Sequence, residues 1–318
     1  MAGPIALEEI RAAKERILGS AFRTPLVRLN VDDAPAEIHL KLENLQPIGS
    51  FKIRGAANAF ALADPGRLRR GVWTASAGNM AQGVAWCARR LGVSCDVVVP
   101  ETAPQTKLTA VRRLGARPIP VPADVWFETF VTRRFPGLEG LMVHPFSDRA
   151  VMAGNGTIGL EILEDLPDVD AVAVPYGGGG LISGIASAMK ALRAQAKVYA
   201  CEVETAAPLK PSLEAGHPVE VGYTPTFVDG IGGPRVFPEM FELVSRLIDG
   251  SLVSSVEEIA AAVRLLAERN RIVSEGAGAA SVAAALSGKV GPGKVVCVVS
   301  GGNIDPAKLA TILSGQVP

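Results

Sequence analysis

The segment AVAVPYGGGGLISG (171–184) joins a run of small and β-branched residues to a helical pattern through four consecutive glycines. The run before the glycines predicts a strand buried on both faces, and residues 181–195 predict the helix that follows it. Glycines at such a turn permit positive φ and let the backbone approach a ligand closely. Their amides could then meet an anion at the helix N-terminus. This segment alone fits a phosphate site and a ligand-free tight turn equally well.

Strand-like and helical segments alternate on both sides of this turn. Strands are expected over residues 37–43, 94–100, 117–122, 171–175, 197–204 and 294–299. Helices are expected over residues 80–92, 105–116, 125–135, 181–195, 256–270 and 277–288. This alternation predicts an α/β fold whose parallel sheets are covered by helices on both faces. The proline-rich stretch 205–251 is expected to be an excursion within one domain, because more α/β pattern follows it.

Composition narrows the class of protein. The chain has 318 residues, of which 48% are hydrophobic, which is enough for two ordinary domains or one large one. Lysine plus arginine and aspartate plus glutamate both number 32, so no basic bias suggests nucleic acid as a partner. The formal net charge of zero does not oppose self-association.

The cysteines and the N-terminus bear on location. Cys87, Cys95, Cys201 and Cys297 form no C-x-x-C pair, so we expect a cytoplasmic protein without disulfides. Cys297 lies in the apolar run VVCVV, which predicts a buried thiol. The N-terminal segment is charged and lacks the apolar block of a signal peptide. No uninterrupted apolar stretch reaches the roughly 18 residues that a membrane span needs, so no membrane partner is expected.

Lys52 lies in GSFKIRGAA (49–57), among small and apolar residues. A lysine on a solvated helix surface would have polar neighbours on its face, whereas this one has Phe51, Ile53 and Gly55. An apolar setting lowers the pKa of an amine and favours nucleophilic or Schiff-base chemistry. Lys52 is therefore a candidate catalytic residue, with an exposed lysine near a helix start as the alternative.

Two further loops contain candidate binding residues. In SAGNMAQG (76–83), the free amides and the hydroxyl of Ser76 could bind a carboxylate, although simple N-capping by Ser76 or Asn79 would explain the same residues. In VVSGGN (298–303), Ser300 follows a buried strand, and ligands of open α/β sheets bind at the carboxyl ends of strands. An ordinary turn at the strand end is the alternative for Ser300.

Together the four segments resemble the serine/threonine dehydratase family of fold-type II pyridoxal 5′-phosphate (PLP) enzymes, which includes threonine deaminases and serine racemases. The resemblance extends from TPL (24–26) to SGGN (300–303), with the motifs in the family's order. It implies a tryptophan synthase β-like fold with two domains, each built on a mainly parallel twisted sheet flanked by helices. Residues 1–45 and 146–318 would form the large PLP-binding domain, and residues 46–145 the small domain.

The resemblance also implies roles for individual residues. Lys52 would hold the PLP aldehyde as a Schiff base and act as the base at the substrate Cα. Cofactor contacts would come from Phe51 beside the ring, Asn79 at the 3′-oxygen, Gly177, Gly178, Gly179, Gly180 and Leu181 around the phosphate, Glu275 at an acidic position nearby, and Ser300 at the pyridine nitrogen. The substrate loop would consist of Ser76, Ala77, Gly78, Asn79 and Met80.

Three positions depart from the family pattern. Met80 replaces the usual His, which could widen tolerance for a larger β-substituent or could be a packing change only. Ala77 occupies the position where racemases of the family place a Ser, which argues against racemase activity. Asn155 replaces a usual Gln. Some relatives bind a divalent cation at residues matching 200–208, but Pro208 stands where an acidic ligand is expected beside Glu202, so no metal is expected here.

The implied reaction is β-elimination from a β-hydroxy amino acid such as L-threonine or L-serine, which gives a 2-oxo acid and ammonia. A dehydratase for 3-hydroxyaspartate or phenylserine, a β-replacement synthase and a non-catalytic PLP-binding protein are the alternatives. A nucleotide-binding α/β protein would need a P-loop lysine or a ribose-binding acidic residue, and the glycine turn has neither. The family implies a homodimer acting on a small-molecule amino acid. The chain ends soon after SGGN, which predicts a short, unregulated or catabolic type.

Overall fold

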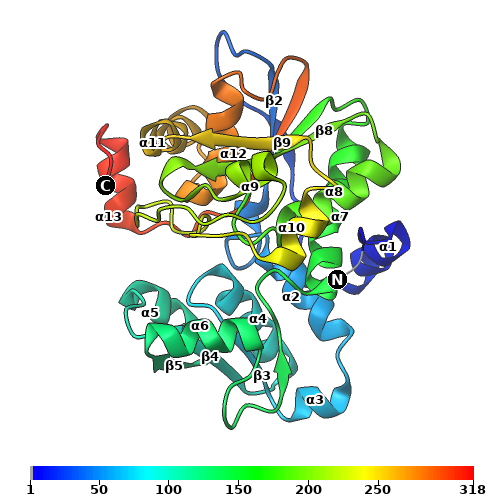
Figure 1. Cartoon of the computed structure of the whole chain (residues 1–318), viewed down its shortest axis with the longest axis vertical. Coiled ribbons are helices and arrows are strands. Elements are labelled where there is room, and N and C mark those ends of the chain that lie inside the picture. Colours follow the sequence, from blue (N-terminus) through cyan, green and yellow to red (C-terminus); the bar gives the residue numbers. More distant parts are fainter. Residues whose placement is uncertain (1–2) are drawn as a thin grey trace.

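The computed structural model describes residues 3–318, and these residues form two sheet-based halves (Figure 1). The larger half has a six-stranded sheet in the order β1-β2-β10-β7-β8-β9, in which β1 is antiparallel to β2 and the other pairs are parallel. Its strands are β1 (Leu26–Arg28), β2 (Glu37–Leu42), β7 (Ala171–Pro175), β8 (Lys197–Val203), β9 (Gly250–Ser254) and β10 (Lys294–Val299).

The smaller half contains a four-stranded parallel sheet in the order β5-β4-β3-β6. Its strands are β3 (Val72–Ala75), β4 (Cys95–Pro100), β5 (Arg117–Val121) and β6 (Leu141–Met142). The expected α/β architecture with parallel sheets is therefore confirmed. The division into domains at residues 45 and 145 is not tested by this topology and stays a prediction.

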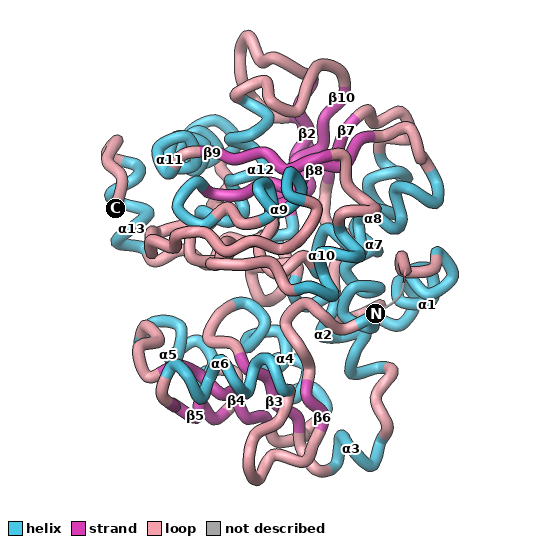
Figure 2. Tube along the Cα trace, viewed as in Figure 1, coloured by secondary structure: helices cyan, strands magenta, loops and turns pink. Residues whose placement is uncertain are grey.

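Helices cover both sheets, and Figure 2 shows how they alternate with the strands. Within residues 3–318 the α-helices are α1 (Leu7–Arg16), α2 (Lys52–Ala61), α3 (Pro65–Arg69), α4 (Asn79–Leu91), α5 (Gln105–Arg113), α6 (Ala123–Thr132), α7 (Arg149–Asp165), α8 (Gly180–Leu192), α9 (Leu209–Ala215), α10 (Pro238–Val244), α11 (Val256–Leu265), α12 (Gly276–Leu286) and α13 (Pro306–Leu313). Short helical turns occur at η1 (Glu43–Leu45), η2 (Glu204–Ala206) and η3 (Leu266–Asn270), the last of which is a π-helical extension of α11.

Alternate residues of the central strand β10 face two different cores. Val296 and Val298 pack in the core formed with α1, α7 and α8, while Cys297 and Val299 pack in the core formed with α11 and α12. A strand buried on both faces has no polar side to present, because side chains alternate across a sheet with a period of two. This explains why the apolar runs of β7 and β10 are nearly uninterrupted.

The helix that follows the glycine turn packs very closely on α7. A Cβ atom at Gly184 of α8 would lie 2.2 Å from the carbonyl oxygen of Met152 and 2.6 Å from the amide nitrogen of Gly156. Only the absence of a side chain permits this approach. Because α7 also contacts α1 and α2, the crossing links the glycine turn to the helix that begins at Lys52.

Two absences can be reported for the described part of the chain. No helix among residues 3–318 is both long and apolar enough to cross a membrane. In the same range, no group of three or more His, Cys, Asp or Glu side chains is arranged to hold a metal ion. Glu202, the candidate metal ligand, accepts hydrogen bonds from the amides of Leu209 and Lys210 at the start of α9 and from the hydroxyl of Ser251.

Candidate active site

Lys52 is the first residue of α2, and the loop before it pairs with the loop after β10. The amide of Phe51 donates to the carbonyl of Ser300 at 3.0 Å, and the amide of Gly302 donates to the carbonyl of Gly49 at 2.9 Å. Gly49 has a φ of +69°, a backbone conformation that a side chain would strain. These contacts place the start of α2, at Lys52, beside the loop that contains Ser300, although the two lie far apart in the sequence.

The ammonium group of Lys52 lies in a poorly solvated position. Its Nζ donates to the carbonyl oxygen of Pro145 at 2.6 Å and lies 5.0 Å from the ring centre of Phe51. Burial lowers the pKa of Lys52 to about 8, against the opposing charge of Glu275. At this pKa about a tenth of the amine is unprotonated at pH 7, far more than for an ordinary lysine, and the unprotonated amine is the form that acts as a nucleophile or base.

The glycine turn between β7 and α8 packs against Phe146, the neighbour of Pro145. A Cβ atom at Gly178 would lie 2.0 Å from the Phe146 ring, and one at Gly180 would lie 2.7 Å from the Phe146 carbonyl. Gly179 has a φ of +87°, and no side chain caps the N-terminus of α8. Bare amides at a helix N-terminus are suited to bind a phosphate. Leu181, in the first turn of α8, is buried.

A second support lies beneath the glycine turn. The side-chain nitrogen Nδ2 of Asn155 in α7 donates to the carbonyl oxygen of Gly180 at 3.2 Å. Asn155 is fully buried, and a Cβ atom at Gly55 of α2 would lie 3.0 Å from its Oδ1. Asn155, which replaces the family's usual Gln, therefore contacts both the glycine turn and α2, the helix that begins at Lys52.

The expected substrate loop leads into α4. Gly78 precedes the helix without a side-chain cap from residues 3–318, and the hydroxyl of Ser76 accepts a hydrogen bond from the Gly78 amide at 3.3 Å. The alternative that Ser76 or Asn79 simply caps this helix is therefore wrong. Residues 76–79 are partly exposed, whereas Met80 is 1% exposed and belongs to the apolar core of the smaller half. Met80 thus points away from the loop that its neighbours form.

Three side chains from distant segments meet beside this loop. The side-chain nitrogen Nδ2 of Asn79 donates to Oε1 of Glu275 at 2.8 Å, and Nδ2 of Asn303 donates to Oδ1 of Asn79 at 2.8 Å. Burial raises the pKa of Glu275 to about 7, against the hydrogen bond from Asn79. Sequence analysis identified Asn79 and Glu275 but missed Asn303, although it lies in the same SGGN segment as Ser300.

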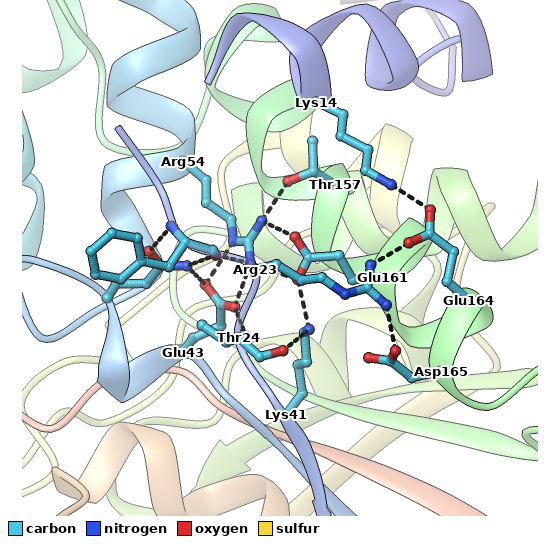
Figure 3. Close-up of polar contacts among 12 residues, drawn as sticks. Lys14, Arg23, Thr24, Lys41, Glu43, Arg54, Thr157, Glu161, Glu164 and Asp165 are labelled. Carbon is cyan, nitrogen blue, oxygen red and sulfur yellow. Dashed lines mark hydrogen bonds and ion pairs between the residues drawn. The ribbon is translucent and has the colours of Figure 1, made fainter. Parts of the chain in front are cut away.

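A buried ionic cluster lies behind α2 and was also missed (Figure 3). Arg54 donates from Nε to Glu43 at 2.8 Å and from Nη1 to Glu161 at 2.7 Å, and Lys41 donates to Glu161 at 2.6 Å. All four side chains are almost fully buried, and their charges sum to zero. The cluster ties α2 to η1, β2 and α7, so it holds the helix that begins at Lys52.

The family comparison agrees with this geometry. The family model "Pyridoxal-phosphate dependent enzyme" matches residues 17–301, so the chain belongs to this family and has PLP as its cofactor. The chain is 43% identical to an L-threonine ammonia-lyase of Thermotoga maritima, over 98% of this chain and 78% of that protein. It is 39% identical to the catabolic L-threonine dehydratase of Escherichia coli K12, over 97% of this chain and 96% of that protein.

Solved structures give the same result. The maize serine racemase superposes with a TM-score of 0.90 at 32% identity, covering 99% of this chain and 98% of that one. The fold-type II architecture and the resemblance to serine/threonine dehydratases are therefore confirmed. The uncapped N-terminus of α8 and the amine of Lys52 have the chemistry that would fit the phosphate and the aldehyde of such a cofactor.

Proposed function

We propose that this chain catalyses PLP-dependent β-elimination of a β-hydroxy amino acid such as L-threonine or L-serine, giving a 2-oxo acid and ammonia. The observation that carries the proposal is the position of Lys52. Its low-pKa amine donates to the carbonyl of Pro145, whose neighbour Phe146 packs against the glycine turn, and the amide of the preceding residue, Phe51, donates to the carbonyl of Ser300. The names of the relatives, which are threonine ammonia-lyases and dehydratases, support the same activity.

The cofactor, when bound, supplies an electron sink for negative charge on the substrate Cα. In this proposal Lys52 is the amine that holds the cofactor and the base that removes the Cα proton, a role for which a pKa of about 8 is suited. The carbonyl of Pro145 accepts a hydrogen bond from Nζ of Lys52 and so keeps the amine close to the residues that pack against the glycine turn.

Other residues orient the two ligands. The bare amides of Gly177, Gly178, Gly179 and Gly180, with Leu181, would hold the phosphate, and Phe51 would pack beside the ring. Ser300 would face the pyridine nitrogen, and Asn79 would donate to the 3′-oxygen. Ser76, Ala77, Gly78 and Asn79, which are partly exposed, would hold the substrate carboxylate.

Ala77 favours elimination over racemisation. Racemisation needs a proton donor on the face of Cα opposite Lys52, and an alanine side chain cannot donate a proton. The buried position of Met80 supports the interpretation of this residue as a packing change, so it offers no argument for a larger β-substituent. Threonine and serine are therefore preferred to phenylserine in this proposal.

The test is an oxo-acid assay on a panel of L- and D-β-hydroxy amino acids that includes serine, threonine, 3-hydroxyaspartate and phenylserine. We expect 2-oxo acid from L-threonine or L-serine, and none from the Lys52→Ala variant. Conversion of L-serine to D-serine should stay at background, and an Ala77→Ser variant is the matched control that would introduce a second proton donor. Absence of oxo acid from every member of the panel would refute the proposal.

We further propose that the chain acts as a cytoplasmic homodimer, with domains at residues 1–45 plus 146–318 and 46–145. Its zero net charge does not oppose association, and within residues 3–318 the cysteines are free and buried. The packing of α2 against both α7 of the larger half and α4 of the smaller half supports a domain boundary close to Lys52. Sedimentation equilibrium of the holoenzyme would test the dimer, and a monomeric mass would contradict it.

A further inference from the structure

A directed chain of hydrogen bonds runs from Ile48 to Glu275 through two asparagines. The amide nitrogen of Asn303 lies 2.9 Å from the carbonyl oxygen of Ile48, and a backbone carbonyl can only accept. The same nitrogen lies 2.8 Å from Oδ1 of Asn79. The nitrogen of Asn79 is therefore turned toward Glu275, to which it donates at 2.8 Å. The Ile48 carbonyl at one end and the Glu275 carboxylate at the other thus set the same direction for the bonds between them.

Close packing holds this arrangement in place. A Cβ atom at Gly49 would lie 2.7 Å from Oδ1 of Asn303, and one at Gly301 would lie 2.5 Å from Oε1 of Glu275. The backbones of Gly49 and Gly302 are bonded to each other at 2.9 Å. The Glu275 carboxylate and one side of the Asn303 amide thus lie against bare glycine backbone, although Asn303 as a residue is exposed.

The amide of Asn79 has two N–H groups, and Glu275 uses one of them. Its oxygen is occupied by Asn303. The group left for a ligand is the second N–H, which is a donor. Without Asn303 the orientation would depend on Glu275 alone. A rotation of the Asn79 amide would then present its oxygen, which repels an anionic ligand oxygen.

We propose that Asn303 is a positioning residue that fixes the amide of Asn79 so that it offers an N–H donor, and not its carbonyl, to the 3′-oxygen of PLP. Asn303 acts only through Asn79, with Ile48 as the anchor on one side and Glu275 as the acceptor on the other. The inference rests on the proposed role of Asn79 as a cofactor ligand. It does not depend on which amino acid is the substrate.

The test measures the affinity of the apoenzyme for PLP and the absorption spectrum of the bound cofactor. We expect Asn303→Ala to weaken PLP binding roughly 10- to 100-fold, the range for loss of one hydrogen bond to a charged acceptor, and to shift the bound-cofactor spectrum. Asn303→Asp has the same shape but cannot donate, so it should show at least the same loss. Asn44→Ala is the matched control, because its amide donates to the Val273 carbonyl at 3.1 Å without touching Asn79.

A double-mutant cycle separates positioning from general destabilisation. In an Asn79→Ala background, the Asn303→Ala change should cost almost nothing more in PLP affinity, because the residue through which it acts is gone. An equal loss in both backgrounds would overturn the proposal, as would PLP binding by both Asn303 variants within twofold of the unmodified protein. Failure of the oxo-acid assay with these binding results intact would refute the proposed reaction and leave this inference standing.

Discussion

Removal of the Arg54 guanidinium should destabilise the protein strongly. Arg54→Met keeps an unbranched apolar side chain but leaves Glu43 and Glu161 buried with Lys41 as the remaining cation. The cluster then changes from zero to one net negative charge in a region almost without solvent. Breaking a buried pair by removing one partner costs about 3–5 kcal/mol. At about 2–4 °C per kcal/mol, the melting temperature should fall by roughly 6–20 °C.

The assay is thermal unfolding of the holoenzyme followed by circular dichroism, with Arg149→Met as the matched control. Arg149 pairs with Glu9 at 2.8 Å and also joins α7 to a neighbouring helix, but both side chains are about two-fifths exposed. Exposed pairs contribute about 0–1 kcal/mol. If Arg54→Met lowers the melting temperature no more than Arg149→Met, the buried cluster does not stabilise the fold as argued.

The pH dependence gives a second check of the same reasoning. Burial alone would raise the pKa of Glu43, but the charge and hydrogen bonds of Arg54 outweigh it and hold the pKa below its usual value. In the unmodified protein this carboxylate therefore stabilises the fold above its unfolded pKa, and the contribution is lost as pH falls through the folded pKa. In Arg54→Met, burial dominates and the pKa is raised, so the variant gains stability as pH falls. The difference between the two melting temperatures should shrink from pH 8 to pH 5.

Three other predictions test the site. Because the pKa of Lys52 is lowered to about 8 and the unprotonated amine reacts, the rate of PLP uptake by the apoenzyme should rise with pH and level off above about 8; a rise that continues to pH 10.5 in stopped-flow absorbance would contradict this. Gly178→Ala should lower the free energy of unfolding by about 1–3 kcal/mol and weaken PLP binding, because its Cβ would lie 2.0 Å from Phe146. Gly177→Ala is the control: its Cβ would lie 3.4 Å from the nearest neighbour, so urea should unfold this variant closer to the midpoint of the unmodified protein. Met80→Leu should cost less than about 1.5 kcal/mol and leave the substrate ranking of the oxo-acid panel unchanged, since the side chain lies in the core; a reordered ranking would place it in the substrate pocket.

Local pattern was enough to predict the elements that form the glycine turn. The expected strand before Gly177 is β7, and the helix expected over residues 181–195 is α8, which spans Gly180–Leu192. A short apolar run rich in small and β-branched residues, and apolar residues at helical spacing, are properties of neighbouring residues, so a single sequence shows them. Helix ends were less accurate, because they depend on capping and on the last turn. The helix expected over residues 125–135 spans Ala123–Thr132. The helix expected over residues 256–270 has the expected ends but becomes π-helical after Leu265.

The sequence by itself determined the α/β class, the glycine turn and the candidate lysine, since each depends on residues adjacent in the chain. The tertiary structure alone decided which polar groups meet. Asn303 bonds Asn79 across 224 positions of sequence, and Arg54 bonds Glu161 across 107. Met80 shows the same limit, because its place in the motif suggested a substrate contact and its packing puts it in the core. Hydrogen bonds and ion pairs depend on distances of about 3 Å in space. Strand order and helix packing set those distances, and the local sequence pattern does not show them.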